Sequence, residues 1–460
     1  MKKRYIGAVL FVLLLILYRF IPATEAIPRE QVTALSFLAL CMILWFTEFI
    51  PLGASALVII ILPSIMGLST LKETLTAFPN PTIFFVIATF ALSSALMKVP
   101  LAKRLLLSLL KISGSSVNFF LLAVMGATFL ISSIMSNIPA TAMFIPICMS
   151  FLECYDKEED KKRTGRAFMI GLAVAGMIGG IITPAGSANN LVSLSILEET
   201  GKISVTFFEW MVICAPIAFI ILPVSWLLII VVFKPAKIEK AKVYDFKKSL
   251  ETLPKPDAKE IFVAVVMLTM IILWVLSSWY TQFDTNIVAI VGMAIMFLPG
   301  IDIFTWKEFS KEVSWPVFLM VGSVLCVASI LTKSGIASRL GELLFNVTPG
   351  MSASVLVLKL ALFISVMQLL IPNGPAVIAL TTPLVITAAQ EVGINPAILT
   401  IPLCVLASWT IIIPLSAVPM VTYSTGYYKV TDIGKVGVPV MAIVSLIMCI
   451  WIPFITSVVL

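Results

Sequence analysis

The sequence contains no histidine, and histidine is the side chain that most often serves as general base, metal ligand or proton relay. Only 12% of its residues are charged, which is about half the share in a soluble domain. Its seven cysteines are scattered, mostly in apolar segments, and show no metal-ligand spacing, so we expect small core residues. These scarcities argue against a histidine- or metal-dependent enzyme and against a soluble fold.

Apolar residues take the place of the missing charge, since 60% of the chain is hydrophobic against roughly 45–50% in a soluble domain. Apolar runs long enough to cross about 30 Å of bilayer hydrocarbon begin near residue 5 and recur to the end of the chain. The composition predicts an all-α polytopic membrane protein in contact with the lipid bilayer. The net charge of +7 lies mostly in loops, where it indicates membrane topology and no nucleic-acid site.

The sequence predicts about eleven membrane spans and two re-entrant hairpins. The hairpins are expected at 117–153 and 351–390, because each region holds two apolar segments of about 15–18 residues, which are short for a full crossing. Two spans, 165–197 and 394–427, are long and interrupted. The other predicted spans are 5–22, 32–50, 52–67, 81–98, 208–233, 260–280, 284–300, 315–332 and 436–458.

Basic residues predict the orientation of these spans. They cluster at the N-terminus, after the fourth span, after the first hairpin and in the linker 234–259. Counting crossings from a cytoplasmic N-terminus places all four clusters in the cytoplasm and the C-terminus outside. We therefore expect a multi-pass protein of a bacterial-type inner (plasma) membrane, with the linker dividing the halves 1–233 and 260–460.

The two halves resemble each other. Segments 81–104 and 316–339 align without a gap, each ends on Arg, and Lys98 meets Lys333 in the alignment. The central Asn of the hairpin follows that Arg by 33 residues in the first half and by 34 in the second. An odd number of spans in each half would invert the second copy, so the pattern predicts inverted-topology repeats.

Four breaks interrupt the apolar segments at corresponding places, namely the hairpin tips at Asn137 and Asn373 and the stretches 183–190 and 414–419. An interrupted backbone survives in lipid only where it lines a cavity or faces protein. Exposed helix N-termini favour an anion, and free carbonyls suit a small cation such as sodium. The alternative for any single Ser or Thr is a helix-packing role. The candidate substrate-binding residues are Ser136, Asn137, Thr141, Ser187, Asn189, Pro372, Asn373, Gly374 and Ser416.

Several motifs in this order and spacing resemble the divalent anion/sodium symporter family, whose members include the INDY-type dicarboxylate and citrate carriers. They are Trp45 to Leu52, the Ser136-Asn137 hairpin, Gly179-Gly180 leading into Gly186 to Asn190, and Ser408 to Ser416. The resemblance implies a scaffold domain that forms a homodimer and a transport domain that holds both hairpins. It also implies alternating access by an elevator movement, with di- and tricarboxylates or sulfate as substrates.

In that family each hairpin tip carries Ser-Asn-Thr, which grips the substrate and helps to bind two sodium ions. The resemblance carries over Ser136 and Asn137 at the first tip, where Ile138 replaces the Thr. At the second tip only the Asn matches, because Pro and Gly stand in place of Ser and Thr. Gln368 stands where a small hydroxyl is usual, and Met420 replaces a late Asn. The residues that the resemblance assigns to a first sodium site are Ser132, Ser136, Asn137 and Gly186.

The sequence therefore predicts a secondary transporter of di- or tricarboxylates. The lost hydroxyls at Pro372 and Gly374 favour anion exchange or reduced sodium coupling. No cofactor is expected apart from Na+ as a candidate coupling ion. A sodium-coupled dicarboxylate or sulfate symporter and an arsenite or sodium/proton antiporter stay open, although proton exchange usually needs a titratable group at the midplane. A channel and a membrane-embedded enzyme are other classes, and an enzyme would need a nucleophile with a base or a metal cluster.

Overall fold

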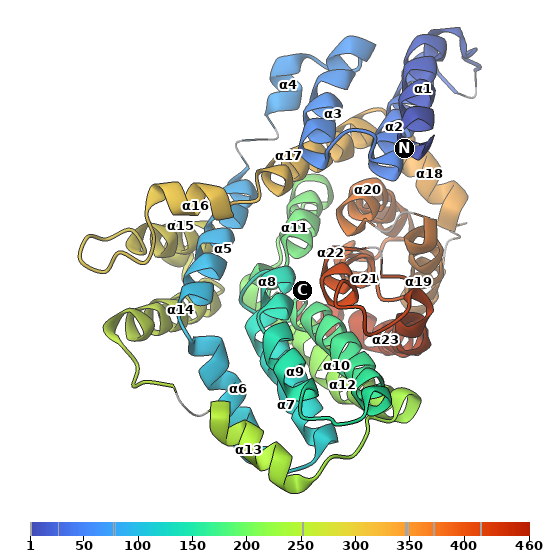
Figure 1. Cartoon of the computed structure of the whole chain (residues 1–460). Helices are drawn as coiled ribbons and strands as arrows, with labels where there is room; N and C mark the ends of the chain where they lie inside the picture. The colour runs from blue at the N-terminus through green and yellow to red at the C-terminus, as the bar shows by residue number, and fades with distance from the viewer. Residues whose placement is uncertain are drawn as a thin grey trace.

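The structure is a computed structural model that describes residues 2–25, 27–76, 78, 80–250, 253–345, 348, 350–370, 373–414 and 416–460. Every regular element in these ranges is helical, which confirms the predicted all-α class. Figure 1 shows the helices gathered into several bundles, with α5 and α17 running between them.

The first half holds α1 (Lys2–Leu17), η1 (Tyr18–Phe20), α2 (Arg29–Thr47), α3 (Leu52–Met66), α4 (Leu71–Leu75), α5 (Pro81–Lys98), α6 (Leu101–Ile112), α7 (Val117–Ser132), α8 (Asn137–Ala142), α9 (Ile145–Leu152), α10 (Glu158–Gly179), η2 (Pro184–Gly186), α11 (Ala188–Gly201) and α12 (Phe207–Phe233). The linker holds α13 (Lys240–Leu250). The second half holds α14 (Ala258–Leu276), η3 (Thr281–Phe283), α15 (Thr285–Ile295), α16 (Trp306–Glu312), α17 (Trp315–Lys333), α18 (Ile336–Phe345), α19 (Ala353–Leu370), α20 (Gly374–Val392), α21 (Ala397–Ser408), α22 (Ala417–Tyr423) and α23 (Val430–Val459).

Seven of the described helices are long and apolar enough to cross a membrane, namely α2, α5, α12, α14, α17, α20 and α23. Shorter helices of 16, 15 and 11 residues, α1, α3 and α15, cover three further predicted spans. The predicted interruptions are present, because 165–197 is divided into α10, η2 and α11, and 394–427 into α21 and α22. One helix of the second hairpin is longer than predicted, since α20 continues through Pro383 to reach 19 residues.

Helices of one half pack on helices of the other. In the first half α5 packs along α15, and in the second half α17 packs along α3 in the same manner. Both α5 and α17 begin with Pro near the N-terminus and end on Lys. The amphipathic helices α6 and α18 follow them directly. The same pair of elements therefore leads into each hairpin.

The hairpins belong to two neighbouring bundles (Figure 1). The first hairpin, α7 to α9, packs on α10 and α12, whereas the second, α19 and α20, packs on α21, and α19 also on α23. The bundles meet where α11 contacts α20 and α21, and where α22 contacts α8 and α10. Because α11 and α22 are the segments that follow the two interruptions, the broken parts of the chain lie at the junction of the bundles.

The linker segment packs against the first bundle more closely than its charged composition suggests. Val243 and Phe246 of α13 are buried, and the Phe246 ring contacts the rings of Phe120 and Phe151. Lys247 donates a 2.7 Å hydrogen bond to the carbonyl of Leu110 at the end of α6. Two apolar residues in the spacing of one helix face are enough to dock α13, and the lysines surround them.

Indole side chains satisfy backbone carbonyls at the end of α10, where the break leaves them without helical partners. The Trp409 indole N–H donates to the carbonyl of Met177 at 3.0 Å. The Trp210 indole N–H donates to the carbonyl of Ile181 at 2.9 Å. Both tryptophans are fully buried. An interrupted backbone inside an apolar bundle is thus stabilised by partners from two other helices.

Candidate functional site

The first hairpin tip lies between the end of α7 and the start of α8. The Ser132 hydroxyl lies 2.8 Å from Asn137 Oδ1 and 2.6 Å from the carbonyl oxygen of Gly176 in α10. A Cβ atom at Gly180 would overlap Asn137 Oδ1 and lie 2.6 Å from Nδ2, so the carboxamide lies directly on the end of α10. Ser136 and Asn137 are half-buried, which leaves polar atoms of both within reach of a ligand.

The first interruption lies directly behind this tip. The Thr183 hydroxyl donates to the carbonyl of Ser133 at 2.5 Å and accepts from the N–H of Gly186 at 3.2 Å. A Cβ atom at Gly186 would lie 2.7 Å from the carbonyl oxygen of Gly180 and 3.0 Å from that of Ser132. Carbonyl oxygens thus converge around Gly186, and oxygen atoms are the ligands that hard cations prefer.

The second hairpin tip has the same amide at its centre. Asn373 is the N-cap of α20, and its Oδ1 accepts the N–H of Ala376 at 3.3 Å. This bond fixes the side chain at the start of α20 and leaves the Nδ2 hydrogens as donors. Asn373 is half-buried. The predicted site residue Pro372 lies outside the described residues.

Asn189 joins the second tip to the first interruption. Its Nδ2 donates to the Ser408 hydroxyl at the end of α21 at 3.0 Å. A Cβ atom at Gly374 would lie 3.0 Å from the same Nδ2 and 2.7 Å from the carbonyl oxygen of Ala407, so only Gly fits between them. Asn189 follows Ser187, whose hydroxyl accepts the N–H of Asn189 at 3.3 Å as the N-cap of α11. These contacts bring together three of the four breaks.

The second interruption, between α21 and α22, is also built on side-chain hydrogen bonds. The hydroxyls of Thr410 and Ser416 hydrogen-bond across it. Gln368, near the end of α19, donates from Nε2 to the carbonyl of Leu406, much as Ser132 near the end of α7 contacts a carbonyl of α10. Gln368 is 4% exposed, and its Oε1 has no hydrogen-bond partner among the described residues.

Two further polar residues lie behind the tips. Thr141 is fully buried, and its hydroxyl lies against Gly176. This hydroxyl has no hydrogen-bond partner among the residues that the structure describes. Asn190 is also fully buried, and its Nδ2 donates to the carbonyls of Gly180 at 2.7 Å and Thr183 at 2.9 Å. Asn190 therefore supports the interruption, whereas its neighbour in sequence faces the second tip. The sequence shows only two adjacent asparagines and does not distinguish their roles.

The half-buried polar side chains of the four breaks form one set. Its members are Ser136, Asn137, Ser187, Asn189, Asn373, Ser408 and Ser416, with Gly374 beside them. All are neutral, and all carry donors or acceptors that could orient an oxygen-rich anion. The sequence prediction named every one of them except Ser408, which it recognised only as part of a motif.

A polytopic helical protein with two hairpin tips and two interrupted helices meeting at neutral polar side chains belongs to the class of membrane transporters. Within that class, the sequence matches the model of the sodium:sulfate symporter transmembrane region over residues 2–459, and the chain belongs to this family. The resemblance to the divalent anion/sodium symporters that the sequence motifs indicated is thereby confirmed.

Individual relatives cover nearly the whole chain. The sodium-dependent dicarboxylate transporter SdcS of Staphylococcus saprophyticus is 25% identical in an alignment 472 positions long, which covers 97% of this chain and 90% of that protein. An uncharacterised transporter of Haemophilus influenzae is 24% identical over 446 residues, covering 94% and 93%. Among solved structures, the YdaH transporter of Alcanivorax borkumensis has a similar fold, with a TM-score of 0.56 at 15% identity over 84% of this chain and 88% of that one.

Proposed function

We propose that this chain is a secondary carrier of di- or tricarboxylate anions. The observation that carries the proposal is the contact of Asn189 with both Ser408 and Gly374, which brings the starts of α11 and α20 and the end of α21 to one place. The relatives named sodium-dependent dicarboxylate transporters support the substrate class. We expect the chain to work in the plasma membrane as a homodimer.

The proposed site binds its anion through dipoles. Amide groups of Asn137, Asn189 and Asn373 and hydroxyls of Ser136 and Ser187 supply the donors, together with N–H groups at helix starts. A neutral site holds a dianion less tightly than an arginine would, because no full positive charge neutralises it. Weak binding suits a carrier, since the substrate has to leave on the opposite side of the membrane.

Sodium coupling is proposed to be reduced relative to a two-ion symporter. The carbonyl oxygens of Gly180 and Ser132 converge around Gly186, and Asn137 Oδ1 lies 2.8 Å from the Ser132 hydroxyl, so this cluster of oxygens would suit one sodium ion. In the second half, Gly374 lacks the hydroxyl that the family pattern supplies, and a buried Gln368 amide occupies the place of a small hydroxyl. Sodium-coupled symport is the second candidate, and the intact first cluster together with the sodium-dependent relatives favours it.

An elevator movement is the proposed mechanism of alternating access. Both hairpins, the interrupted helices α10–α11 and α21–α22, and the polar set between them would move as one unit. The remaining helices, among them α2 to α5 and α14 to α17, would stay fixed in the membrane. Because the four breaks contact one another within the moving unit, the substrate site would cross the membrane without being dismantled.

The test is a counterflow measurement in proteoliposomes that contain unlabelled dicarboxylate. We expect labelled dicarboxylate to enter with or without a sodium gradient, and competing di- and tricarboxylates and sulfate to rank the specificity. Uptake that requires an inward sodium gradient and needs no internal dicarboxylate would contradict anion exchange, which the sequence favours, and would support sodium-coupled symport. Entry of labelled dicarboxylate that does not saturate would contradict the carrier assignment, because a carrier has a finite number of sites.

A further inference from the structure

The paired basic residues of the two halves are not part of the anion site. Lys98 ends α5 and Lys333 ends α17, and each is followed by an amphipathic helix that carries Arg104 or Arg339. We refer to α6 and α18 as the arms, because each connects one of these long helices to a hairpin. These basic residues recur at corresponding positions of the two halves, and each has polar or acidic groups of other helices beside it.

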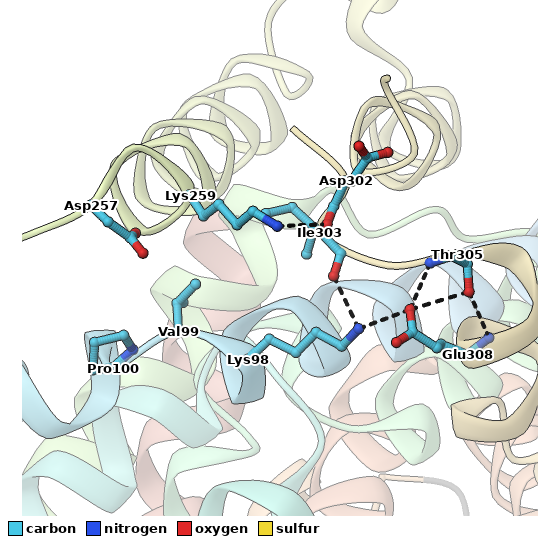
Figure 2. Close-up of a pocket in the computed structure, with 9 residues that line it drawn as sticks. All are labelled: Lys98, Val99, Pro100, Asp257, Lys259, Asp302, Ile303, Thr305 and Glu308. Atoms are coloured by element: carbon cyan, nitrogen blue, oxygen red, sulfur yellow. Dashed lines mark hydrogen bonds and ion pairs between the residues drawn. The ribbon is translucent and has the colours of Figure 1, made fainter. Parts of the chain in front are cut away.

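The end of α5, directly before the first arm, is tied to α16 of the second half. The Lys98 ammonium lies 3.1 Å from a carboxylate oxygen of Glu308, and the same nitrogen donates to the carbonyl of Ile303 at 3.0 Å (Figure 2). That carboxylate also accepts the N–H of Thr305 at 2.8 Å, in a capping box that begins α16. The capping box fixes the position of the Glu308 carboxylate. The glutamate side chain therefore loses less conformational entropy when it pairs with Lys98.

A second ion pair fixes the arm itself, six residues after Lys98. The guanidinium of Arg104 bonds both carboxylate oxygens of Glu260, with 2.9 Å from Nη2 to Oε2, and donates to the carbonyl of Pro254 at 2.6 Å. Glu260 is 2% exposed and lies at the start of α14. A buried carboxylate in bidentate contact with arginine is a specific connection, unlike a surface pair between two mobile side chains.

The second arm has corresponding partners in the first half. Thr70, Lys72 and Glu73 form the same T-x-K-E capping box at α4 as Thr305 to Glu308 form at α16. The Ser69 hydroxyl, the Thr70 N–H and, more weakly, Lys333 stabilise the carboxylate and lower the pKa of Glu73 to about 2. Lys333 lines the same cavity as Glu73.

The arginine position of the second arm is matched as well. Arg339 Nη1 donates to Gln31 Oε1 at 3.3 Å, and Gln31 lies at the start of α2 as Glu260 lies at the start of α14. The second arm thus meets an amide where the first arm meets a carboxylate.

We propose that the Lys98–Glu308 and Arg104–Glu260 ion pairs are permanent anchors that hold the first arm on the fixed part of the second half. Lys333, in the same cavity as Glu73, and Arg339, bonded to Gln31, hold the second arm in the corresponding way. The inference rests on the proposed elevator movement. These are positioning residues, since they never touch the substrate. They fix the points about which the arms bend while the hairpins travel.

A contact at the other end of α5 differs from the anchors, because it joins α5 to the proposed moving unit. Asn80, the N-cap of α5, donates from Nδ2 to the Ser195 hydroxyl at 2.8 Å and to a Glu199 carboxylate oxygen at 2.5 Å. Both partners lie on α11, which belongs to the proposed moving unit. This contact has to break in each transport cycle, whereas the anchors stay closed.

Cross-linking distinguishes the two kinds of contact. In a background with the seven native cysteines replaced, Lys98→Cys with Glu308→Cys forms the anchor variant, and Asn80→Cys with Glu199→Cys forms the matched control. A bifunctional thiol reagent about as long as two side chains joins each pair. Before cross-linking, we expect the anchor variant to transport about threefold more slowly at unchanged KM and thermal stability, because hinge residues govern rates.

Cross-linking the anchor variant is expected to restore transport to the rate of the background, and cross-linking the control to reduce it at least about tenfold. Block of transport by the anchor cross-link would overturn the anchor proposal and leave the elevator movement intact. An anchor variant that already transports at the background rate would also overturn it, because the ion pair would then be an ordinary surface pair. Undiminished transport by the cross-linked control would instead contradict the elevator movement itself.

Discussion

Replacing Asn137 by Ala is expected to lower the initial rate of dicarboxylate transport at least about 100-fold, because hydrogen bonds to a charged group contribute about 1.5–3 kcal/mol each and more than one is lost. The carboxamide is the acceptor for Ser132 and, in the proposed function, a donor to the anion. Ser132 keeps the carbonyl of Gly176 as a partner, so the fold should survive. Uptake into proteoliposomes, with size-exclusion chromatography of the variant, measures both effects.

Asn373→Ala should have a similarly large effect, because Asn373 holds the corresponding place at the second tip. Asn118→Ala is the matched control, since Asn118 lies at the opposite end of α7 from the first tip. We expect it to transport at the rate of the unmodified protein. Normal uptake by both tip variants would remove the two asparagines from the substrate site.

Gly180→Ala is the second substitution with a large expected effect. Gly180 has ordinary right-handed backbone angles, φ −63° and ψ −14°, so alanine costs nothing in backbone strain. Its methyl group would nevertheless overlap the Asn137 carboxamide and displace it. We expect transport to fall about 10- to 100-fold, since an active group misplaced by about 1 Å can lose that much.

Gly126→Ala is a suitable control for this steric argument. Gly126 lies in α7, and a Cβ atom there would meet only a side-chain methyl of Leu109 at 3.5 Å, an ordinary contact. Equal transport by the Gly180 and Gly126 variants would show that the position of the Asn137 amide does not matter. Comparison of KM with the maximal rate would tell whether substrate binding or a later step is affected.

Much of the fold followed from the sequence, because a bilayer restricts backbone breaks so strongly. Asn137 and Asn373 were identified as hairpin tips because an amide beside Pro or Gly interrupts an apolar run, and lipid tolerates such a break only at a cavity or a protein contact. The all-α class and the family were predicted in the same way, and both are confirmed. The positions of the tips and of the interruptions could thus be predicted from the sequence.

Contacts between distant segments could not be predicted from the sequence. Asn189 and Asn190 look alike in sequence, yet one faces the second tip and the other supports the first interruption, because a helix turns adjacent residues to different sides. Lys98 was recognised as half of a repeated pair, but its partner Glu308 comes from the other half of the chain and leaves no local signal. The docking of α13 was missed for a related reason, since two apolar residues determine it among many charges.

The central claim is that the breaks of both halves line one anion site, and labelling of cysteines tests it most directly. Ala188→Cys and Ala417→Cys place a thiol at the start of α11 and of α22, next to Ser187 and Ser416. Native Cys154, the partly buried cysteine, is replaced by Ser in both variants. The rate of maleimide labelling is then measured with and without saturating dicarboxylate.

We predict that a transported dicarboxylate slows labelling at both positions, to a similar extent and at the same half-maximal concentration, because one bound anion covers both thiols. A monocarboxylate that is not transported should have no effect. Protection at one position alone, or at neither, in variants that still transport dicarboxylate would contradict a single site shared by the two halves.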